Sequence, residues 1–238
     1  MEHISVENVS YTYQGKYQKV QALKNVSCSF EKQKFYAVIG HSGSGKTTLL
    51  SMLAGLGVPS EGAIQVDGAV LQQIGTERHR RENVSVIYQA FNLFPALTVL
   101  ENVMYPMQIG HISKKEAAIK AKELLNSVRI TDDQFKKFPT MLSGGEQQRV
   151  AIARALASKA KVILADEPTG NLDTENGKIV IDILKRLVRE EQYCVIVVTH
   201  DLGIAGQADI VHDLGIAGQA DIVYRMTDGR LLREEHQL

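Results

Sequence analysis

The chain has 238 residues, of which 44% are apolar, and this is enough for one large α/β domain with a sizeable core. Lys and Arg together number 27, as do Asp and Glu, so the formal net charge of zero excludes a basic field that would hold nucleic acid. No apolar run approaches the roughly 18 residues that cross a bilayer, and the N-terminus lacks a signal-peptide pattern. Cys28 and Cys194 lack metal-ligand spacing, so we expect two reduced, packed thiols in a cytosolic protein.

The N-terminal third is predicted to contain alternating strands. ISVENVSYTY (4–13), VQALKNVSCSF (20–30) and GAIQVDG (62–68) are rich in β-branched and aromatic residues, which predicts an antiparallel β layer. FYAVIG (35–40) is a short apolar strand that ends in glycine, and TTLLSMLAGL (47–56) continues with good helix formers. A strand–loop–helix unit therefore follows the first two strands.

The loop of this unit, GHSGSGKT (40–47), has the spacing of a phosphate-binding P-loop. Its glycines let successive backbone NH groups surround an anion, and the helix N-terminus adds its positive dipole end. Lys46 is expected to reach the β and γ phosphates, and the Thr47 hydroxyl to bind Mg²⁺. A glycine-rich turn that only caps a helix is the structural alternative. The predicted nucleotide-binding residues are Gly40, Ser42, Gly43, Ser44, Gly45, Lys46, Thr47 and Thr48.

The segment 89–157 is predicted to be mainly helical. KKEAAIKAKELLNSV (114–128) has apolar residues at helical spacing. The entry to this region, AFNLFPALTVLENVMYPM (90–107), is unusually apolar for a connection. This composition indicates either a groove for a partner helix or burial in the domain's own core.

The stretch LSGGEQQRVAIARAL (142–156) is predicted to begin a helix at Ser143. Serine is a good N-cap, and Glu146 three residues later completes a capping box. An ordinary capped helix is the simplest interpretation. The paired glycines after Ser143 cost helix stability, however, and this favours a group that closely approaches their NH groups.

A second candidate site element is KVILADEPTGNLD (161–173). Its apolar run suits a parallel strand covered on both faces, and the strand delivers Asp166 and Glu167 at its carboxyl end. Asp166 is expected to hold Mg²⁺, and Glu167 to deprotonate the water that attacks the γ phosphate. A solvated helix start is the alternative, but two adjacent carboxylates at a buried strand edge need a cation or a partner. A helix is predicted at 177–191.

These motifs, and above all LSGGEQQR, resemble the ABC-type ATPases over nearly the whole chain. The resemblance implies a single domain over 1–238 with an α/β fold. It would comprise a P-loop NTPase core with a mainly parallel sheet (1–88 and 158–238), an N-terminal antiparallel β layer and an inserted helical subdomain (89–157). The resemblance also implies a homodimer that sandwiches two ATP molecules. In that dimer each copy holds one ATP molecule. The γ phosphate of that ATP is contacted by the opposite copy through Ser143, Gly144 and Gly145.

Three further residues take expected roles from the resemblance alone. Tyr13, in VSYTY, would stack on adenine, with a plain strand residue as the alternative. Gln89, in VIYQAFNLFP, would contact Mg²⁺ and the attacking water, with a plain turn residue as the alternative. Asp173, in GNLD, would meet the phosphate loop of the other copy.

The twelve residues HDLGIAGQADIV at 200–211 recur without a gap at 212–223. The resemblance implies a histidine that binds the γ phosphate directly after a strand, and the strand YCVIVVT (193–199) ends immediately before His200. We therefore predict His200, and not His212, as this residue.

The free-energy cost of placing His212 at this position also favours His200. Placing the second histidine after a strand would bury Gln207 and Asp209 in the sheet, at a cost of several kcal/mol for an unpaired charge. Lengthening a loop is milder, because each doubling adds only about 0.6 kcal/mol of closure entropy. Only the second copy continues into the predicted strand, Asp-Gly turn and strand of 220–232. The additional residues that the duplication introduces are expected near 204–215, as an exposed loop or extended helix.

Together these features predict the ATP-hydrolysing subunit of an ABC transporter, using ATP and Mg²⁺. It would be cytoplasmic, and peripheral on the inner face of the membrane through a separate integral membrane permease. ADEPTGNLD with LSGGEQQR resembles the branch for macrolide export, lipoprotein release and antimicrobial-peptide resistance, and the related cell-division ATPase is the alternative. Importers, which typically have DEPTSALD, are less favoured. So are soluble ABC proteins of DNA repair or translation, which carry a coiled-coil insertion or two cassettes. The presence of Glu167 and His200 argues against a regulatory protein that binds a nucleotide without hydrolysing it.

Overall fold

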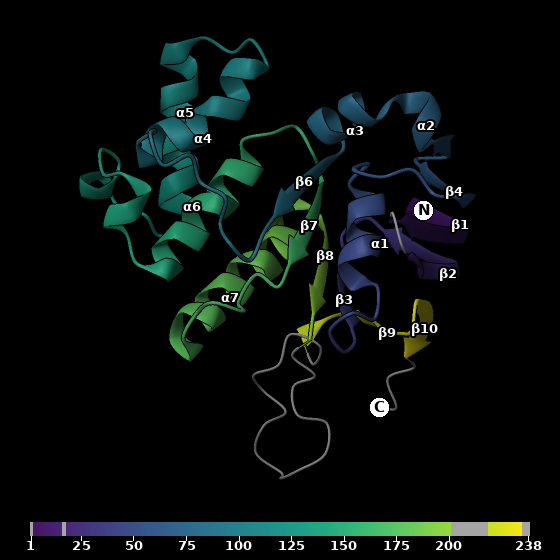
Figure 1. Ribbon diagram of the computed structural model, residues 1–238. Coiled ribbons are helices and arrows are strands. Elements are labelled where there is room, and N and C mark those ends of the chain that lie inside the picture. The colour runs from purple at the N-terminus through teal and green to yellow at the C-terminus, as the bar shows by residue number, and fades with distance from the viewer. Residues whose placement is uncertain (1, 16–17, 201–218, 235–238) are drawn as a thin grey trace.

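The computed structural model describes residues 2–15, 18–200 and 219–234, and it contains two β-sheets with helices packed against them (Figure 1). The smaller sheet has the order β2-β1-β4-β5, and all its neighbouring strands are antiparallel. This sheet is the predicted N-terminal antiparallel layer, which is thereby confirmed. Its strands are β1 (Glu2–Gln14), β2 (Lys19–Glu31), β4 (Glu61–Val66) and β5 (Ala69–Val70).

The larger sheet has six strands in the order β10-β9-β3-β8-β7-β6, and only the β9–β10 pair is antiparallel. The continuous apolar runs of β3 and β8 are buried along their whole length, as expected for parallel strands that helices cover on both faces. The strands are β3 (Phe35–Ile39), β6 (Val84–Ile87), β7 (Val162–Asp166), β8 (Cys194–Thr199), β9 (Ile222–Thr227) and β10 (Arg230–Glu234).

Two hydrophobic cores meet at the parallel sheet. Helix α1 (Lys46–Leu53) lies between the two sheets (Figure 1), and its Leu49 and Leu50 pack in one core with residues of both. Helix α7 (Thr174–Glu191) packs in the other core, with alternate residues of β3 and β8 such as Val197. Each fully buried leucine contributes roughly 1.5–3 kcal/mol to the free energy of unfolding. The P-loop and the carboxyl ends of the strands are thus held on a rigid framework.

Three longer helices lie together at the β6 side of this framework (Figure 1). The helices α4 and α6 begin at capping boxes built on Thr98 and Ser143, and the Ser143 capping box was predicted. The sequence did not predict two short helices between β5 and β6. The helices of this part of the chain are α2 (Leu71–Ile74), α3 (Thr76–Glu82), α4 (Val99–Ile109), α5 (Lys114–Ser127) and α6 (Gly144–Leu156), with 3-10 turns at Asp132–Gln134 and Pro139–Met141.

The apolar entry segment is only partly buried. Val99, Val103 and Met107 are buried in the domain's own core. Phe94 and Tyr105 stay 41% and 40% exposed, and their rings contact each other with centroids 4.8 Å apart. Part of this segment therefore closes the core, and part remains an exposed aromatic surface.

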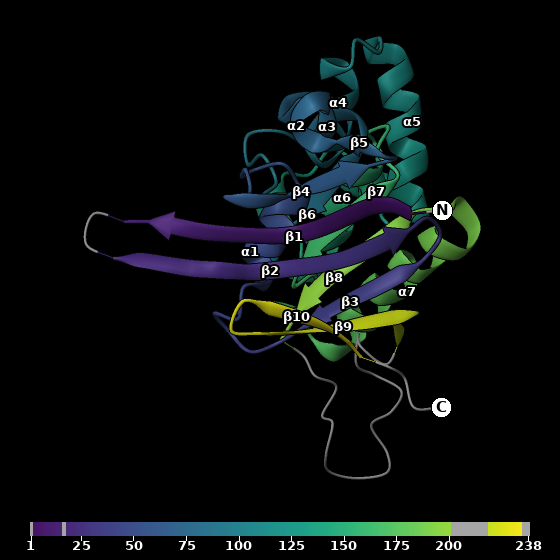
Figure 2. The same ribbon diagram turned by 90° about the vertical axis from the view of Figure 1, so that its right-hand side faces the viewer.

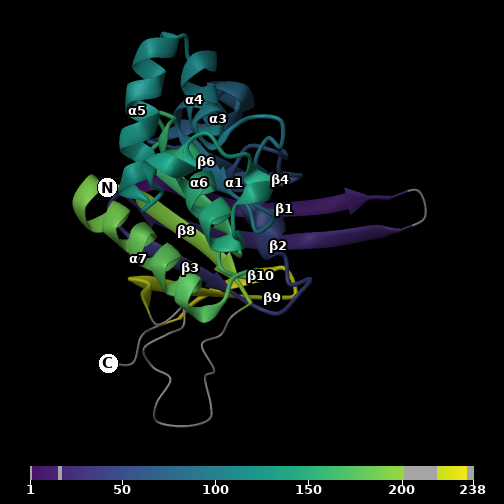
Figure 3. The same ribbon diagram turned by 90° about the vertical axis from the view of Figure 1, so that its left-hand side faces the viewer.

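The β1–β2 hairpin extends well beyond the rest of the molecule (Figures 2 and 3). Near its outer end Tyr13 pairs with Val20 across the two strands, and both side chains are 48% exposed. This hairpin forms one wall of the candidate site.

The duplicated segment is described only at its two ends. The strand predicted before it is β8, and His200 follows this strand directly, as expected. The second copy enters β9 at Ile222, which pairs with Tyr36 of β3, and this confirms the predicted continuation. Asp221 anchors the entry, because its carboxylate accepts a hydrogen bond from the Phe35 NH at 2.7 Å. His212 and the additional residues predicted near 204–215 lie outside the described residues.

Both cysteines are free thiols that pack into the protein. Burial raises the pKa of Cys28 and of Cys194 to about 12, so neither thiol forms a reactive thiolate near neutral pH. In the part of the chain that the structure describes, no helix combines the length and apolar character needed to cross a membrane.

Candidate functional site

The phosphate loop joins β3 to α1, and its shape depends on glycine. Gly43 and Gly45 have φ values of 77° and 111°, in the left-handed region that favours glycine. A Cβ atom on Gly40 would lie 2.3 Å from the carbonyl oxygen of Met226 in β9, so no other residue fits there without displacing the backbone. The loop ends at the N-terminus of α1, where free NH groups favour an anion.

The Lys46 side chain spans this loop from beneath. Its Nζ donates hydrogen bonds to the carbonyl oxygens of Gly40 at 2.8 Å and His41 at 3.0 Å. Burial lowers the pKa of the Lys46 ammonium, while the nearby carboxylates of Glu167 and Asp166 partly oppose this shift. An arriving phosphate would give this buried cation an anionic partner.

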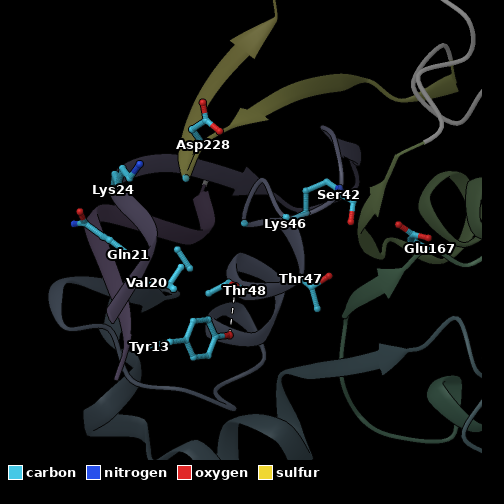
Figure 4. Close-up of a pocket in the computed structure, with 14 residues that line it drawn as sticks. Tyr13, Val20, Gln21, Lys24, Ser42, Lys46, Thr47, Thr48, Glu167 and Asp228 are labelled. Carbon is cyan, nitrogen blue, oxygen red and sulfur yellow. Dashed lines mark hydrogen bonds between the residues drawn. The ribbon is translucent and has the colours of Figure 1, made fainter. Parts of the chain in front are cut away.

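A cavity of about 580 Å³ opens in front of the loop (Figure 4). It lies between the β1–β2 hairpin, the phosphate loop and the turn between β9 and β10. Its volume lies within the range of small-molecule sites. The side chains labelled in Figure 4 around it are Tyr13, Val20, Gln21, Lys24, Ser42, Lys46, Thr47, Thr48, Glu167 and Asp228.

Tyr13 lies at the hairpin side of this cavity, across from the phosphate loop (Figure 4). Its hydroxyl is 3.4 Å from Oγ1 of Thr48, and the Tyr11 ring contacts the Tyr13 ring edge-on at 4.9 Å between centroids. The half-exposed ring is therefore held in place by two neighbours. An aromatic face in this position suits stacking with a planar base.

The two predicted magnesium ligands on α1 and β7 meet at the edge of the cavity. The Thr47 hydroxyl donates to Oδ1 of Asp166 at 3.4 Å. Burial raises the pKa of Asp166, and the neighbouring Glu167 carboxylate adds to the rise, while Thr47 and Lys46 oppose it. Hydroxyl and carboxylate oxygens are ligands that Mg²⁺ prefers, so this pair fits such a cation. No group of three or more His, Cys, Asp or Glu side chains in residues 2–15, 18–200 and 219–234 is arranged to hold a metal.

Glu167 and His200 are in direct contact beside the cavity. Glu167 directly follows β7, its NH donates to the carbonyl of Val198, and its φ of 46° lies in the left-handed region. His200 directly follows β8, and its Nδ1 lies 2.8 Å from Oε1 of Glu167. A non-glycine residue in this region is strained, which is common at functional sites. The two adjacent strands thus place a carboxylate and an imidazole together.

Gln89 lies on the same side, two residues after the end of β6. Its Nε2 is 3.3 Å from Oδ1 of Asn171, and a Cβ on Gly170 would lie 2.7 Å from the same nitrogen. The resemblance implied that Gln89 contacts Mg²⁺ and the attacking water, but nothing in the sequence indicated these two partners.

Ser143, Gly144, Gly145 and Asp173 do not line the cavity. The exposed Ser143 caps α6, and its Oγ accepts from the NH of Glu146 at 3.3 Å. Gly145 is buried, and a Cβ there would lie 2.2 Å from Oδ1 of Asn176 in α7. The space beside the Cα of Gly145 is therefore occupied by Asn176 of the same chain, and the expected role of Gly145 toward a second copy stays a prediction.

Asp173 also has a local partner. It is the N-cap of α7, and its Oδ1 accepts from the NH of Asn176 at 2.8 Å. Asn176 in turn accepts at Oδ1 a hydrogen bond from Arg149 of α6 at 3.1 Å. The starts of α6 and α7 are thus joined by one polar network, which the sequence analysis did not identify.

The turn between β9 and β10 is a further component that the sequence analysis missed. The NH of Gly229 donates to the carbonyl of Ser44 at 2.9 Å, and Asp228 and Gly229 line the cavity. The Asp-Gly pair predicted a hairpin turn, but no local pattern indicates that this turn packs against the phosphate loop. Only the parallel pairing of β9 with β3 brings the two together.

Comparisons with known proteins agree with this geometry. The sequence profile of the ABC transporter family matches residues 23–170. An uncharacterised ABC transporter ATP-binding protein of Mycobacterium tuberculosis is 41% identical over 212 residues, which cover 87% of this chain and 85% of the relative. A lipoprotein-releasing system ATP-binding protein of Chlorobium chlorochromatii is 45% identical over 190 residues, covering 78% and 77%.

Solved structures are similar over almost the full length. The dimeric structure of the ABC transporter cassette MJ0796, a protein of Methanocaldococcus jannaschii, superposes with a TM-score of 0.85 at 36% identity, covering 98% of this chain and 97% of that one. A dimeric post-hydrolysis structure of the same cassette, bound to ADP and phosphate, gives a TM-score of 0.84 at 36% identity with the same coverage.

Proposed function

The chain belongs to the ABC transporter family as an ATP-binding protein, and we propose that it hydrolyses ATP as a homodimer and thereby drives a separate membrane permease. The observation that carries this proposal is the contact between Glu167 and His200 beside the phosphate loop. A related cassette was solved as a dimer with ADP and phosphate, which are the products of such a reaction.

Glu167 is the proposed general base. Its carboxylate lines the same cavity as Lys46 and Thr47, where the γ phosphate of ATP would lie. There it would accept a proton from the attacking water as the water oxygen bonds to phosphorus and the bond to the ADP oxygen breaks. His200, at 2.8 Å from the Glu167 carboxylate, would hold that side chain in position and donate to the transferred phosphoryl group.

Thr47 and Asp166 are the proposed Mg²⁺ ligands, with Gln89 completing the set. The cation would supply positive charge to the phosphate oxygens while Lys46 contacts them from the loop. Tyr13 is proposed to stack on the adenine ring.

A second copy is proposed to complete the site. Ser143 and Gly144 lie at the N-terminus of α6, outside the cavity of their own chain, so they can serve a nucleotide only across an interface. Asp173 lies beside them, at the N-terminus of α7. Helix N-termini favour phosphate, which gives this arrangement a physical basis.

The transport branch is proposed from relatives and motif. The lipoprotein-releasing relative is 45% identical over 190 residues, and three methionine import relatives are 36–39% identical over 203–205 residues. Release or export is proposed from the higher identity together with the ADEPTGNLD motif. Cell-division ATPases are the alternative. We propose that the exposed aromatic pair Phe94 and Tyr105 faces the permease, and that the chain is cytoplasmic and held at the membrane through it.

Phosphate release from ATP with Mg²⁺ tests the hydrolysis. Lys46→Ala removes the ammonium from the loop and is expected to weaken ATP binding about 10- to 100-fold, because hydrogen bonds to charged groups are worth about 1.5–3 kcal/mol. Lys115→Ala, on the exposed part of α5, is the matched control. Unchanged ATP affinity in Lys46→Ala would exclude this cavity as the nucleotide site. Co-purification of an untagged membrane protein with the tagged chain tests the permease.

A further inference from the structure

Two hydrogen bonds join Gln89 to Asn171, although 82 residues separate them in the chain. The Gln89 Nε2 donates to Oδ1 of Asn171 at 3.3 Å, and the Asn171 Nδ2 donates back to the carbonyl oxygen of Gln89 at 3.1 Å. Because both the side chain and the backbone of Gln89 are engaged, a single asparagine fixes this residue at two points. Asn171 lies four residues after Glu167, on the connection that leads from β7 to α7.

Gly170 makes room for this arrangement. An ideal Cβ at this position would lie 2.7 Å from Nε2 of Gln89 and 3.3 Å from Oε2 of Glu167. The first distance is shorter than any real Cβ contact, so a side chain would displace Gln89. Gln89 and Glu167 therefore approach each other across a position that only glycine leaves open.

The backbone after Gln89 is held separately. Phe91 and Asn92 have φ values of 60° and 49°, both in the left-handed region. Arg154 of α6 donates to the carbonyls of Asn92 at 2.6 Å and Phe91 at 3.1 Å, and burial lowers the pKa of its guanidinium. This turn is therefore supported by α6 as well as by Asn171, so loss of Asn171 should loosen the turn without unfolding it.

We propose that Asn171 is a positioning residue that holds Gln89 beside Glu167, and that Gly170 provides the space for it. The inference rests on the proposed function, in which Glu167 activates water and Gln89 lies next to that water. Without Asn171 the Gln89 side chain regains rotamer freedom, which is worth up to about 1.5–2 kcal/mol for glutamine. The catalytic geometry would then be populated only part of the time. The competing role for Asn171, which is exposed, is a direct contact with the second copy.

A double-mutant cycle separates the two roles. Asn171→Ala is expected to lower kcat for ATP about two- to tenfold, with the ATP Kd unchanged, since one or two neutral hydrogen bonds are lost. In a Gln89→Ala background the same substitution should cause no further loss, because the group that it positions is absent. Gly170→Ala should behave in the same way, with a loss only when Gln89 is present. Equal losses in both backgrounds would overturn the proposal.

Hydrogen exchange provides a readout that needs no turnover. In the nucleotide-free protein, amides of residues 88–94 should exchange about two- to tenfold faster in Asn171→Ala than in the wild type. Asn126→Ala, an exposed asparagine on α5, is the matched control and should leave this segment unchanged. If the wild type fails to hydrolyse ATP, the proposed function fails, while exchange still tests the positioning. Unchanged exchange together with unchanged kcat in Asn171→Ala would refute the positioning role alone.

Discussion

The Nδ1 atom of His200 lies 2.8 Å from Oε1 of Glu167, although 33 residues separate the two in sequence. Each residue directly follows one of two adjacent parallel strands, β7 and β8. The carboxyl ends of such strands lie at the same edge of a sheet, which is where ligands bind in this architecture. The first copy of the duplicated segment therefore supplies a histidine that already contacts the proposed base.

Substitution of each histidine should show which one acts. His200→Ala removes the partner of Glu167, and we expect at least an approximately 100-fold loss of kcat, the usual effect of losing one preorganised group. His212→Ala is the matched control in the second twelve-residue repeat and should retain near-wild-type ATPase activity. Steady-state phosphate release measures both. Loss of activity only in His212→Ala would contradict the assignment.

Removal of one of the two twelve-residue repeats should leave a protein that folds and hydrolyses ATP. Deleting residues 201–212 restores a single HDLGIAGQADIV between β8 and the rest of β9, so His200 and the carboxylate that anchors β9 are both retained. The connection becomes roughly half as long, which should raise the free energy of unfolding by about 0.6 kcal/mol. Urea denaturation and an ATPase assay of the deletion variant check this. A variant that folds but no longer hydrolyses ATP would show that the duplication has a function of its own.

The electrostatics of Asp166 predict a trade-off between stability and activity. Burial raises the pKa of this carboxyl above its ordinary value of 3.8, so folding favours the protonated form. Its stabilising contribution is fully present below the unfolded pKa and is lost as pH rises through the folded pKa. Asp166→Asn should therefore raise the Tm of the nucleotide-free protein at pH 7, by about 2–4 °C for a chain of this size, and the gain should vanish near pH 4.

Thermal unfolding across pH 4–8, without nucleotide or Mg²⁺, measures this difference. The same variant should lose ATPase activity, because an amide cannot replace the anionic ligand. A Tm at pH 7 equal to or below that of the wild type would show that Asp166 is already stabilised by other groups.

The sequence was informative where a functional element consists of residues that are close together in the sequence. The phosphate loop, the capping box at Ser143 and the strand that ends at Asp166 each have local signals of spacing, capping or continuous burial, and the structure places these elements as predicted. The packing of Gly229 against Ser44 and the pairing of Gln89 with Asn171 have no such signal. Both join segments that only the strand order of the parallel sheet brings together.

Gly145 shows a second limit of sequence interpretation. A Cβ atom on Gly145 would clash with Asn176 of the same chain, and no local sequence signal indicates this neighbour. A glycine requirement reports a lack of space and does not identify the neighbour. For the same reason the sequence could not separate the core residues of the apolar entry segment from the exposed Phe94 and Tyr105.

The central claim is that two copies complete each other's nucleotide sites. Glu167→Gln keeps the shape of the proposed base and removes its ability to accept a proton, so ATP should remain bound and unhydrolysed. The trapped nucleotide would then hold the interface together through Ser143 and Gly144 of the opposite copy.

Light scattering of Glu167→Gln with ATP and Mg²⁺ tests this claim most directly. We expect a species of twice the chain mass, which reverts to the chain mass when ATP is omitted or when Ser143→Arg is added. A complex that stays at the chain mass with ATP bound, or phosphate release at the wild-type rate, would contradict the account.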